Sequence, residues 1–303
     1  MGGFWSSPAP PLTEANLQDQ TGKVFIVTGA TSGYGLLLAR ILYRRNGKVY
    51  LAARDTAKLQ QVADDLKHDF PNSAGEVDFF HLDLSDLSTI KISADAFLAK
   101  ESQLHALWHN AGVMIPPQGS KTKQGYELQL GTNNIGPFLL TKLLVAPRAP
   151  TPAIDFTNLD YHNDEWAWVK YGRSKAGNVL QAAALARRAK DDGIASLALD
   201  PGVAITGLQR TMSGWLLVII RLISQRPEIG AYTQLYAGLQ PDLDVQQPET
   251  WGKPGNLPRI ARLLTSAAVV PPGKLVGGRA DLFDGEASEK FWQWNEEQIK
   301  PYV

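Results

Sequence analysis

Short apolar runs alternate with amphipathic helical patterns from about residue 23 to residue 202, and this alternation constrains the fold more than any other feature. The runs are apolar along their whole length, as expected of strands buried on both faces of a sheet. Such strands alternating with helices form a parallel sheet with right-handed crossovers and helices on both faces, an α/β doubly wound architecture. The expected strands are 23–30, 48–54, 77–84, 104–112 and 194–202, and the expected helices are 33–48, 56–70, 87–100, 138–144 and 176–193.

The domain organisation follows from the same pattern. The first 20 residues are proline-rich and precede the first strand, so we expect an N-terminal extension at 1–20. A chain of this length can bury one large core or two small ones, and length alone does not choose between them. Residues 21–303 are expected to form a single domain, because no linker of low complexity interrupts them. A last short strand is expected near 273–283.

Charge and composition exclude several classes of function. Thirty Lys plus Arg balance thirty Asp plus Glu, so no net field draws the protein to nucleic acid or anionic lipid. The chain has no cysteine, and its five histidines lack metal-ligand spacing, so we expect no metal site. The N-terminus lacks the features of a secretory signal, and the longest apolar run, Trp215–Ile220, is too short to span a bilayer. We therefore expect a cytoplasmic protein, not inserted in a membrane, that acts on a small molecule.

Glycines mark the turn between the first strand and its helix, in the stretch TGATSGYG. Gly29, Gly33 and Gly35 leave backbone N–H groups at a helix N-terminus open to a phosphate group. The alternative interpretation is structural: Gly29 ends a strand, and Gly35 lets the helix pack closely on it. The position of the turn after the first strand of a repeating strand-helix pattern favours phosphate binding.

The end of the second strand bears on the choice of cofactor. A carboxylate there would bond the ribose 2′-hydroxyl of NAD, and Ala53 cannot do this. Arg54 can bind a 2′-phosphate through a charge-assisted contact, so NADP(H) is favoured. The alternative is that Arg54 is an ordinary surface residue at a strand end.

Six motifs follow in the order TGATSGYG, HLDLSD, HNAG, TNNIGPF, YGRSK and DPGVAIT. Together they resemble those of the classical short-chain dehydrogenase/reductases, over about residues 20 to 210. The stretch NLDYHNDEWAWVKYGRSKAGNV and the C-terminal EKFWQWNEEQIKPYV further resemble fungal members, which often belong to secondary-metabolite pathways. The resemblance implies a Rossmann-type fold and an NADP(H)-dependent oxidoreductase that interconverts a ketone and a secondary alcohol on a small apolar metabolite.

The resemblance also assigns roles to individual residues. Asp83 would lie on the adenine side, Asn110 at the end of the fourth strand, and Val203 and Thr206 on the nicotinamide side. Tyr34 departs from the family pattern, in which an aliphatic residue is commoner, and its flat side chain is expected to fit beside the cofactor. The catalytic residues would be Tyr171, Lys175 and Asn133, and the cofactor-binding residues would be Gly29, Ser32, Gly33, Tyr34, Gly35, Arg54, Asp83, Asn110, Tyr171, Lys175, Val203 and Thr206.

Tyr171 and Lys175 are four residues apart, so on a helix both side chains project from one face. A nearby ammonium group favours the phenolate form of a tyrosine, whose ordinary pKa of about 10 makes it a poor proton carrier at neutral pH. Tyr171 would then pass a proton to a substrate oxygen. An isolated pair with this spacing is usually a surface helix pair, and only the ordered motifs around it favour the catalytic interpretation.

The family pattern also requires a serine at the end of a fifth, central strand, and this chain has no serine between residues 136 and 171. Prolines at 147, 150 and 152 oppose a central strand there, because proline cannot donate to a strand ladder. Two interpretations stay open. Either 153–157 replaces the strand and Thr157 replaces the serine, or the sequence lacks a segment of about two dozen residues, and we favour the second because losing a central strand would cost much of a domain's stability.

Two further regions leave alternatives open. Residues of about 207–265 form a substrate lid in the family, and their apolar side chains fit either a lid or ordinary core helices. The C-terminal aromatic residues fit either packing on the domain or a subunit contact, so the oligomeric state stays open, with a homodimer as one option. A second function is also considered: a cofactor-binding pseudoenzyme, in which the missing serine strand impairs redox activity.

Overall fold

The structure is a computed structural model of the 303-residue chain. It describes residues 10, 12–144, 167–189, 191–199, 201–202, 204, 206, 224, 226–239 and 285–303.

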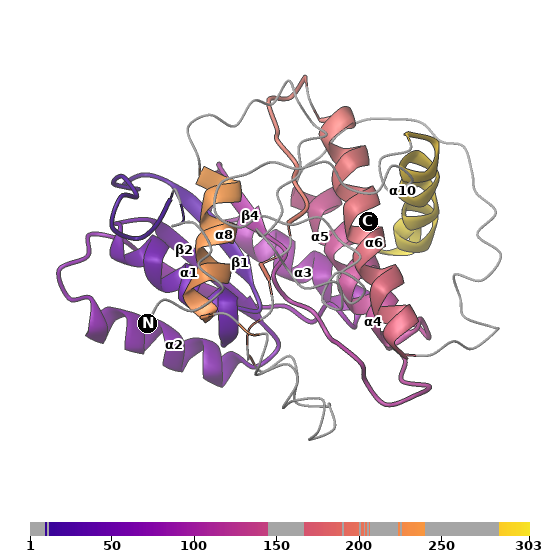
Figure 1. The fold of residues 1–303 in the computed structure, drawn as a ribbon, viewed down its shortest axis with the longest axis horizontal. Coiled ribbons are helices and arrows are strands. Elements are labelled where there is room, and N and C mark those ends of the chain that lie inside the picture. The colour runs from indigo at the N-terminus through magenta and orange to yellow at the C-terminus, as the bar shows by residue number, and fades with distance from the viewer. Residues whose placement is uncertain are drawn as a thin grey trace, which may run out of the picture.

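A parallel sheet forms the centre of the molecule (Figure 1). Its strands are β1 (Val24–Thr28), β2 (Lys48–Ala53), β3 (Val77–His81) and β4 (Ala106–Trp108), in the order β3-β2-β1-β4. The chain therefore moves outward from β1 to β3 and then returns to the other side of β1 to form β4. In open α/β sheets, ligands bind in the crevice at such a reversal of strand order, which falls here at the carboxyl ends of β1 and β4. The predicted Rossmann-type α/β fold is confirmed.

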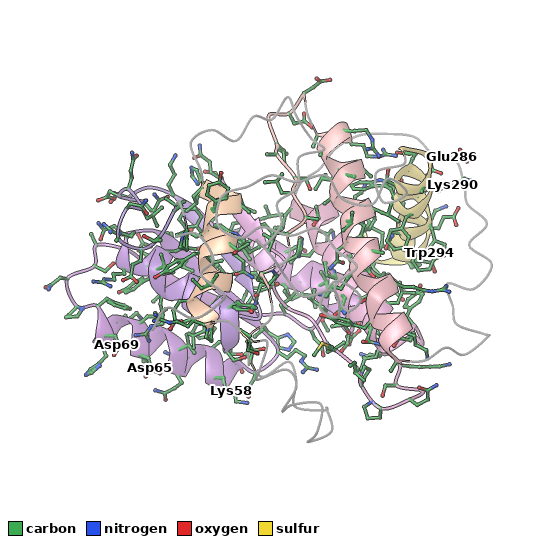
Figure 2. All side chains as sticks on the ribbon, viewed as in Figure 1. Lys58, Asp65, Asp69, Glu286, Lys290 and Trp294 are labelled. Atoms are coloured by element: carbon green, nitrogen blue, oxygen red, sulfur yellow. The ribbon has the colours of Figure 1, made fainter. Side chains whose placement is uncertain are left out.

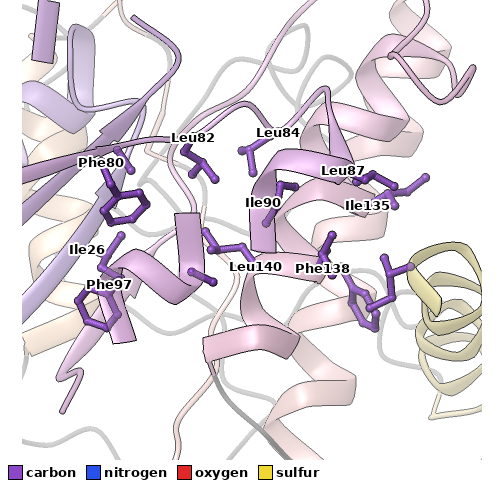
Figure 3. Packing of buried hydrophobic residues seen from close by; sticks show 14 of the residues in the cluster. Ile26, Phe80, Leu82, Leu84, Leu87, Ile90, Phe97, Ile135, Phe138 and Leu140 are labelled. Carbon is purple, nitrogen blue, oxygen red and sulfur yellow. The ribbon is translucent and has the colours of Figure 1, made fainter. Parts of the chain in front are cut away.

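The sheet has a hydrophobic core on each face, because successive side chains of a strand point to opposite sides. In β1, Val24 and Ile26 belong to one buried cluster, whereas Phe25 and Val27 belong to the other. Figure 3 shows part of the first cluster, with Ile26, Phe80, Leu82, Leu84, Leu87, Ile90, Phe97, Ile135, Phe138 and Leu140 labelled.

The three helices between the strands begin and end close to where the sequence predicts. These are α1 (Gly33–Arg44), α2 (Thr56–Asp69) and α3 (Leu87–Leu98). Asp55 caps α2 by accepting a hydrogen bond from the backbone N–H of Lys58, at 3.0 Å. Buried side chains of α1 and α2 pack on one face of the sheet and those of α3 on the other, as doubly wound folds require.

After β4 the chain forms one continuous helical rod of three parts. It consists of α4 (Leu128–Leu130), the π-helical segment η1 (Gly131–Ile135) and α5 (Gly136–Leu144). The sequence predicts only the last of these, at 138–144. Every residue of η1 is buried, and π-helical turns of this kind are frequent at functional sites.

Three longer helices complete the described structure. The catalytic-motif helix α6 (Ala167–Arg188) lies beside the C-terminal helix α10 (Gly285–Ile299), which ends in the short 3-10 helix η4 (Lys300–Tyr302). On the other side of the sheet, α8 (Pro227–Leu239) packs against α1 through the buried Ala231 and Leu235 (Figure 1). The α8 part of the expected lid is therefore packed on α1, and most of the rest of 207–265 lies outside the described residues.

The predicted strand at 194–202 is wrong over its described part, because residues 194–199 have no regular structure. A strand needs a neighbour with which to exchange backbone hydrogen bonds. Among the described residues β4 pairs only with β1, so the described sheet has no strand beyond β4 with which residues 194–199 could pair. The expected strand near 273–283, like Thr157 and the three prolines before it, lies outside the described residues.

The C-terminal aromatic residues pack on the domain itself, which is one of the two alternatives expected for this segment. Trp292 is 1% exposed and meets Phe138 of α5 edge to face, with ring centroids 4.7 Å apart. Glu296 forms an ion pair with Lys142 of α5 at 2.6 Å, and Glu289 pairs with Arg188 of α6. The α10 helix therefore joins α5 to α6. Figure 2 labels Glu286, Lys290 and Trp294 on α10, and Lys58, Asp65 and Asp69 on α2 at the opposite side of the molecule.

We expect Trp292→Ala to lower the free energy of unfolding by about 3 to 5 kcal/mol, the usual result of emptying a buried aromatic site. Trp294→Ala is the matched control, because Trp294 is only partly buried and stacks on Phe291. Chemical denaturation of both variants measures the difference. Equal losses from the two substitutions would contradict the packing described for α10.

Candidate active site

The glycine turn between β1 and α1 lies against the end of β4. Gly29 and Gly33 have φ angles of +67° and +59°, in the left-handed region that favours glycine. A Cβ atom on Gly29 would lie 2.9 Å from Ala111 Cα, and one on Gly35 would overlap the side chain of Asn110. The three glycines are therefore needed for backbone conformation and for close packing across the crevice.

The start of α1 has the features of an anion site. Ser32 occupies the N-cap position in extended conformation, yet its side chain forms no capping hydrogen bond to the helix. The N-terminus of a helix carries partial positive charge and N–H groups without intrahelical partners. The structural interpretation of these glycines and the phosphate-binding interpretation are thus compatible. The absence of side chains allows close packing beside the end of β4 and also leaves the N–H groups at the start of α1 uncovered.

Tyr34 joins the glycine turn to two other parts of the chain. Its hydroxyl group donates a hydrogen bond to the carbonyl oxygen of Gly202, at 3.2 Å. Its ring lies so close to Gly230 of α8 that a Cβ atom there would overlap it. Thr206, predicted on the nicotinamide side, lies against Gly33, whereas Val203 lies outside the described residues. Tyr34 thus brings the glycine turn, the segment 201–206 and α8 together.

The predicted adenine side is held by short hydrogen bonds. Asp83 Oδ1 accepts from the backbone N–H of Ser85 at 2.8 Å and from its hydroxyl group at 2.6 Å. Arg54 is exposed at the end of β2, and no ion pair of its guanidinium group is found within the described residues. These two residues lie at the carboxyl ends of β3 and β2, on the same edge of the sheet as the glycine turn.

An ion pair between the buried Asp86 and the exposed Lys123 fixes the segment that follows Asp83. Burial alone would raise the pKa of Asp86, but hydrogen bonds from Lys123, Ser88 and Gln124 outweigh it and hold the pKa well below its usual range. Lys123 Nζ lies 2.6 Å from Asp86 Oδ2. Asp86 therefore stays ionised at neutral pH and ties the first turn of α3 to the loop before α4.

Asn110 is held in part by Gln234 of α8, a residue that the sequence gives no reason to select. Asn110 Nδ2 donates to the carbonyl oxygen of Thr28 at 2.9 Å, and Gln234 Nε2 of α8 donates to Asn110 Oδ1 at 2.8 Å. Trp108 Nε1 donates to the backbone carbonyl of Gln234 at 2.9 Å. Gln234 lies more than a hundred residues further along the chain, so only the fold reveals this contact.

Tyr171 and Lys175 lie on one face of α6, as their spacing predicts. Lys175 Nζ is 5.6 Å from the centroid of the Tyr171 ring. The same ammonium group lies 3.7 Å from the position that a Cβ atom on Gly112 would occupy. The Tyr-Lys pair therefore lies beside the end of β4, close to the crevice that the glycine turn borders.

Asn133 links α6 to the loop that follows β4. Its Oδ1 accepts from the backbone N–H of Val113 at 2.8 Å, and its Nδ2 donates to Val113 O at 2.9 Å and to Ser174 Oγ at 3.1 Å. The Ser174 hydroxyl group in turn donates to the carbonyl oxygen of Tyr171 at 2.9 Å. Ser174 is a part of the site that the sequence analysis missed, although it stands inside the YGRSK motif.

The described residues contain no candidate metal site and no candidate membrane span. No group of three or more His, Asp or Glu side chains is arranged to hold a metal ion in that part of the chain. No helix there is both long enough and apolar enough to cross a membrane.

Comparison with known proteins agrees with this arrangement. A family model described as short chain dehydrogenase matches residues 23–216. The short-chain dehydrogenase/reductase pkfC of Emericella nidulans is 55% identical, covering 99% of this chain and 99% of the relative, and one from Phomopsis amygdali is 41% identical, covering 97% and 95%. A crystal structure of a protein from Mycobacterium paratuberculosis matches with a TM-score of 0.66 and 28% identity, covering 95% of this chain and 97% of that chain.

The chain belongs to the short-chain dehydrogenase family, whose members are oxidoreductases that bind a nicotinamide cofactor. The alignment with the Emericella nidulans relative extends over 328 positions, 25 more than the 303 residues of this chain. At least 25 positions of that alignment are therefore gaps in this chain.

We expect Gly35→Ala to raise the dissociation constant for the dinucleotide by about fivefold to 150-fold, because overpacking against Asn110 and Gly29 forces the turn to shift and costs roughly 1 to 3 kcal/mol. Gly285→Ala is the control, since a Cβ atom there meets nothing within 4 Å. Titration calorimetry with NADPH measures both. An unchanged dissociation constant for Gly35→Ala would show that the turn does not bind the cofactor.

Proposed function

We propose that the protein is an NADP(H)-dependent reductase that interconverts a ketone and a secondary alcohol on a small apolar metabolite. The observation that carries the proposal is the position of Lys175. Its ammonium group contacts the Tyr171 ring on one side and lies near Gly112 on the other. A proton donor thus stands beside the crevice where a parallel sheet of this order binds a dinucleotide.

Each residue of the site has a part in this proposal. The turn from Gly29 to Gly35 binds the diphosphate, and the cofactor supplies the hydride when it is bound. Tyr171 donates a proton to the substrate oxygen as negative charge develops on it, and Lys175 stabilises the resulting phenolate. Asn133 acts through Val113 and Ser174, holding the loop after β4 against the helix that carries Tyr171.

The preference for NADP(H) rests on Arg54. This arginine is exposed at the end of β2, where its neighbour Ala53 offers no carboxylate for a 2′-hydroxyl group. An arginine is suited to a phosphate group, because its planar guanidinium donates several hydrogen bonds at once.

The missing serine lowers the expected rate but does not exclude the reaction. Loss of one hydrogen-bond donor to the developing oxyanion costs about 10² to 10³ in rate, whereas enzymes commonly supply a factor of 10⁶ or more. We propose that the alignment gaps fall between α5 and α6, where the serine strand is expected. Their number matches the size of segment that the sequence analysis predicts to be missing. Thr157 as a substitute for the serine stays the alternative.

The biological role proposed is in fungal secondary metabolism, and it rests on resemblance alone. The relatives from Emericella nidulans and Phomopsis amygdali support a fungal oxidoreductase of this kind. Residues 21–303 are proposed as one catalytic domain, with an extension at 1–20 and a lid at about 207–265. Because α10 covers part of the outer surface of α5 and α6, a homodimer would have to use another surface or include α10.

The experiment that tests the function measures NADPH binding and ketone-dependent NADPH oxidation in one preparation. We expect Tyr171→Phe to lower kcat at least about a hundredfold, the usual contribution of a general acid, with NADPH binding retained. Tyr50→Phe is the control, because the Tyr50 hydroxyl group bonds Glu101 at the other end of the sheet. Binding of NADPH by the wild type without turnover of any ketone in a panel would support the pseudoenzyme alternative instead.

A second substitution tests the choice of cofactor. Arg54→Ala is expected to weaken NADPH binding between roughly tenfold and a hundredfold, through loss of a charged hydrogen bond, and to leave NADH binding unchanged. Arg40→Ala is the control, since Arg40 pairs with Asp69 at 2.7 Å on the outer side of α1. Parallel fluorescence titrations with both dinucleotides give the comparison. Equal weakening of both would remove Arg54 from 2′-phosphate recognition.

A further inference from the structure

Gln129 of α4 is a fully buried amide that connects two segments bordering the Tyr-Lys pair. Its exposed fraction is 0%, and its Oε1 accepts a hydrogen bond from the backbone N–H of Ile115 at 2.8 Å. Its Nε2 donates to the carbonyl oxygen of Ala167 at 3.3 Å and to Glu127 Oε1 at 3.3 Å. One side chain thus joins the loop after β4 to the first residue of α6.

The backbone that Gln129 holds is strained. Ile115 has a φ angle of +48°, in the left-handed region that a β-branched residue rarely adopts. Within the described residues, the other non-glycine residue with a positive φ is Asn46, a residue type that tolerates this region far better. Strained conformations persist only where surrounding contacts hold them, and they concentrate at functional sites. The hydrogen bond from the Ile115 N–H to Gln129 is such a contact.

Asn133 forms a second connection of the same kind, four residues further along the same helical rod. It joins Val113 of the loop to Ser174 of α6, just as Gln129 joins Ile115 to Ala167. Only Leu130, Gly131 and Thr132 separate the two residues along the rod, and both amides are at least 98% buried. The loop 113–115 is therefore attached to α6 at two points through buried amides.

Both attachments lie close to the proposed proton donor. Gly112, immediately before the loop, lies beside Lys175 Nζ. The carbonyl oxygen of Ala167, which Gln129 contacts, is the one that accepts from the N–H of residue 171 in a regular α-helix. Gln129 therefore contacts the turn of α6 from which Tyr171 projects, while holding the loop that follows the end of β4.

We propose that Gln129 is a positioning residue for the substrate, which sets the spacing between Tyr171 and the loop 113–115 by holding Ile115 in its left-handed conformation. This inference rests on the proposed function, because it makes the loop the wall opposite Tyr171 in the ketone site. In the proposed function the diphosphate of the cofactor binds at the glycine turn, which Gln129 does not contact, so we expect dinucleotide binding to be independent of Gln129.

Because Ile115 is strained, a positioning role for Gln129 can be distinguished from simple packing of its buried side chain. Gln129→Met keeps the length and volume of the side chain but removes its hydrogen bonds, so the loop relaxes. Glycine adopts a φ of +48° without strain, so a loop with glycine at 115 keeps its shape without the contact. Ile115→Gly introduced into the Gln129→Met variant should therefore restore the site, whereas it cannot restore a packing defect around α4.

The test combines ketone kinetics with hydrogen exchange on the full-length protein. Gln129→Met is expected to raise KM for the ketone about tenfold, with NADPH binding unchanged, since one buried hydrogen bond contributes about that factor. The Ile115 amide should exchange faster in this variant, and Ile115→Gly should return KM to within about threefold of the wild type. Asn295→Leu is the control: it removes an equally buried amide, in α10, and should leave KM and this exchange rate unchanged.

Three results would overturn the proposal. These are an unchanged KM in Gln129→Met, an unchanged exchange rate at the Ile115 amide, and a raised KM that Ile115→Gly does not lower. A wild-type protein that turns over no ketone would defeat the proposed function instead. In that case the exchange rates of the Ile115 and Tyr171 amides, compared between the wild type and Gln129→Met, decide whether Gln129 holds the loop and α6 together. Unchanged rates at both amides would reject the positioning role.

Discussion

The close approach of the ends of β1 and β4 is the contact on which the rest of the site depends. Gly29 and Gly35 lie so near Asn110 and Ala111 that neither glycine position has room for a further carbon atom. This approach places the N-terminus of α1 at the point where the strand order reverses, which is where a parallel sheet accepts a ligand. It also brings the Tyr-Lys pair of α6 within reach, because Gly112 immediately follows Ala111 and lies beside Lys175.

Buried amides hold several of the segments around this contact together. Gln234 attaches α8 to Asn110, Asn133 attaches the loop after β4 to Ser174, and Gln129 attaches the same loop to the start of α6. A buried amide is costly unless its hydrogen bonds are formed, so each of these contacts favours one arrangement of the segments over others. The site is thus built from three helices that are distant in sequence and fixed by a few short polar contacts.

The local pattern predicted the first half of the fold, because strands buried on both faces and amphipathic helices leave clear periodic signals. The helical face shared by Tyr171 and Lys175 followed from their spacing alone. The strand predicted at 194–202 was wrong over its described part, because a strand exists only with a neighbour, and its neighbours are not encoded in its own residues. Gln234 could not be predicted either, since its contact with Asn110 depends entirely on how α8 packs on α1.

The most direct test of the account is a crystal structure of the protein with NADPH bound. The account predicts that the diphosphate lies on the backbone N–H groups of the turn between Gly29 and Gly35. The nicotinamide ring should then extend past Gly112 toward the hydroxyl group of Tyr171, with Lys175 Nζ near the adjoining ribose. A dinucleotide bound away from this turn, or a nicotinamide ring directed away from Tyr171, would contradict it.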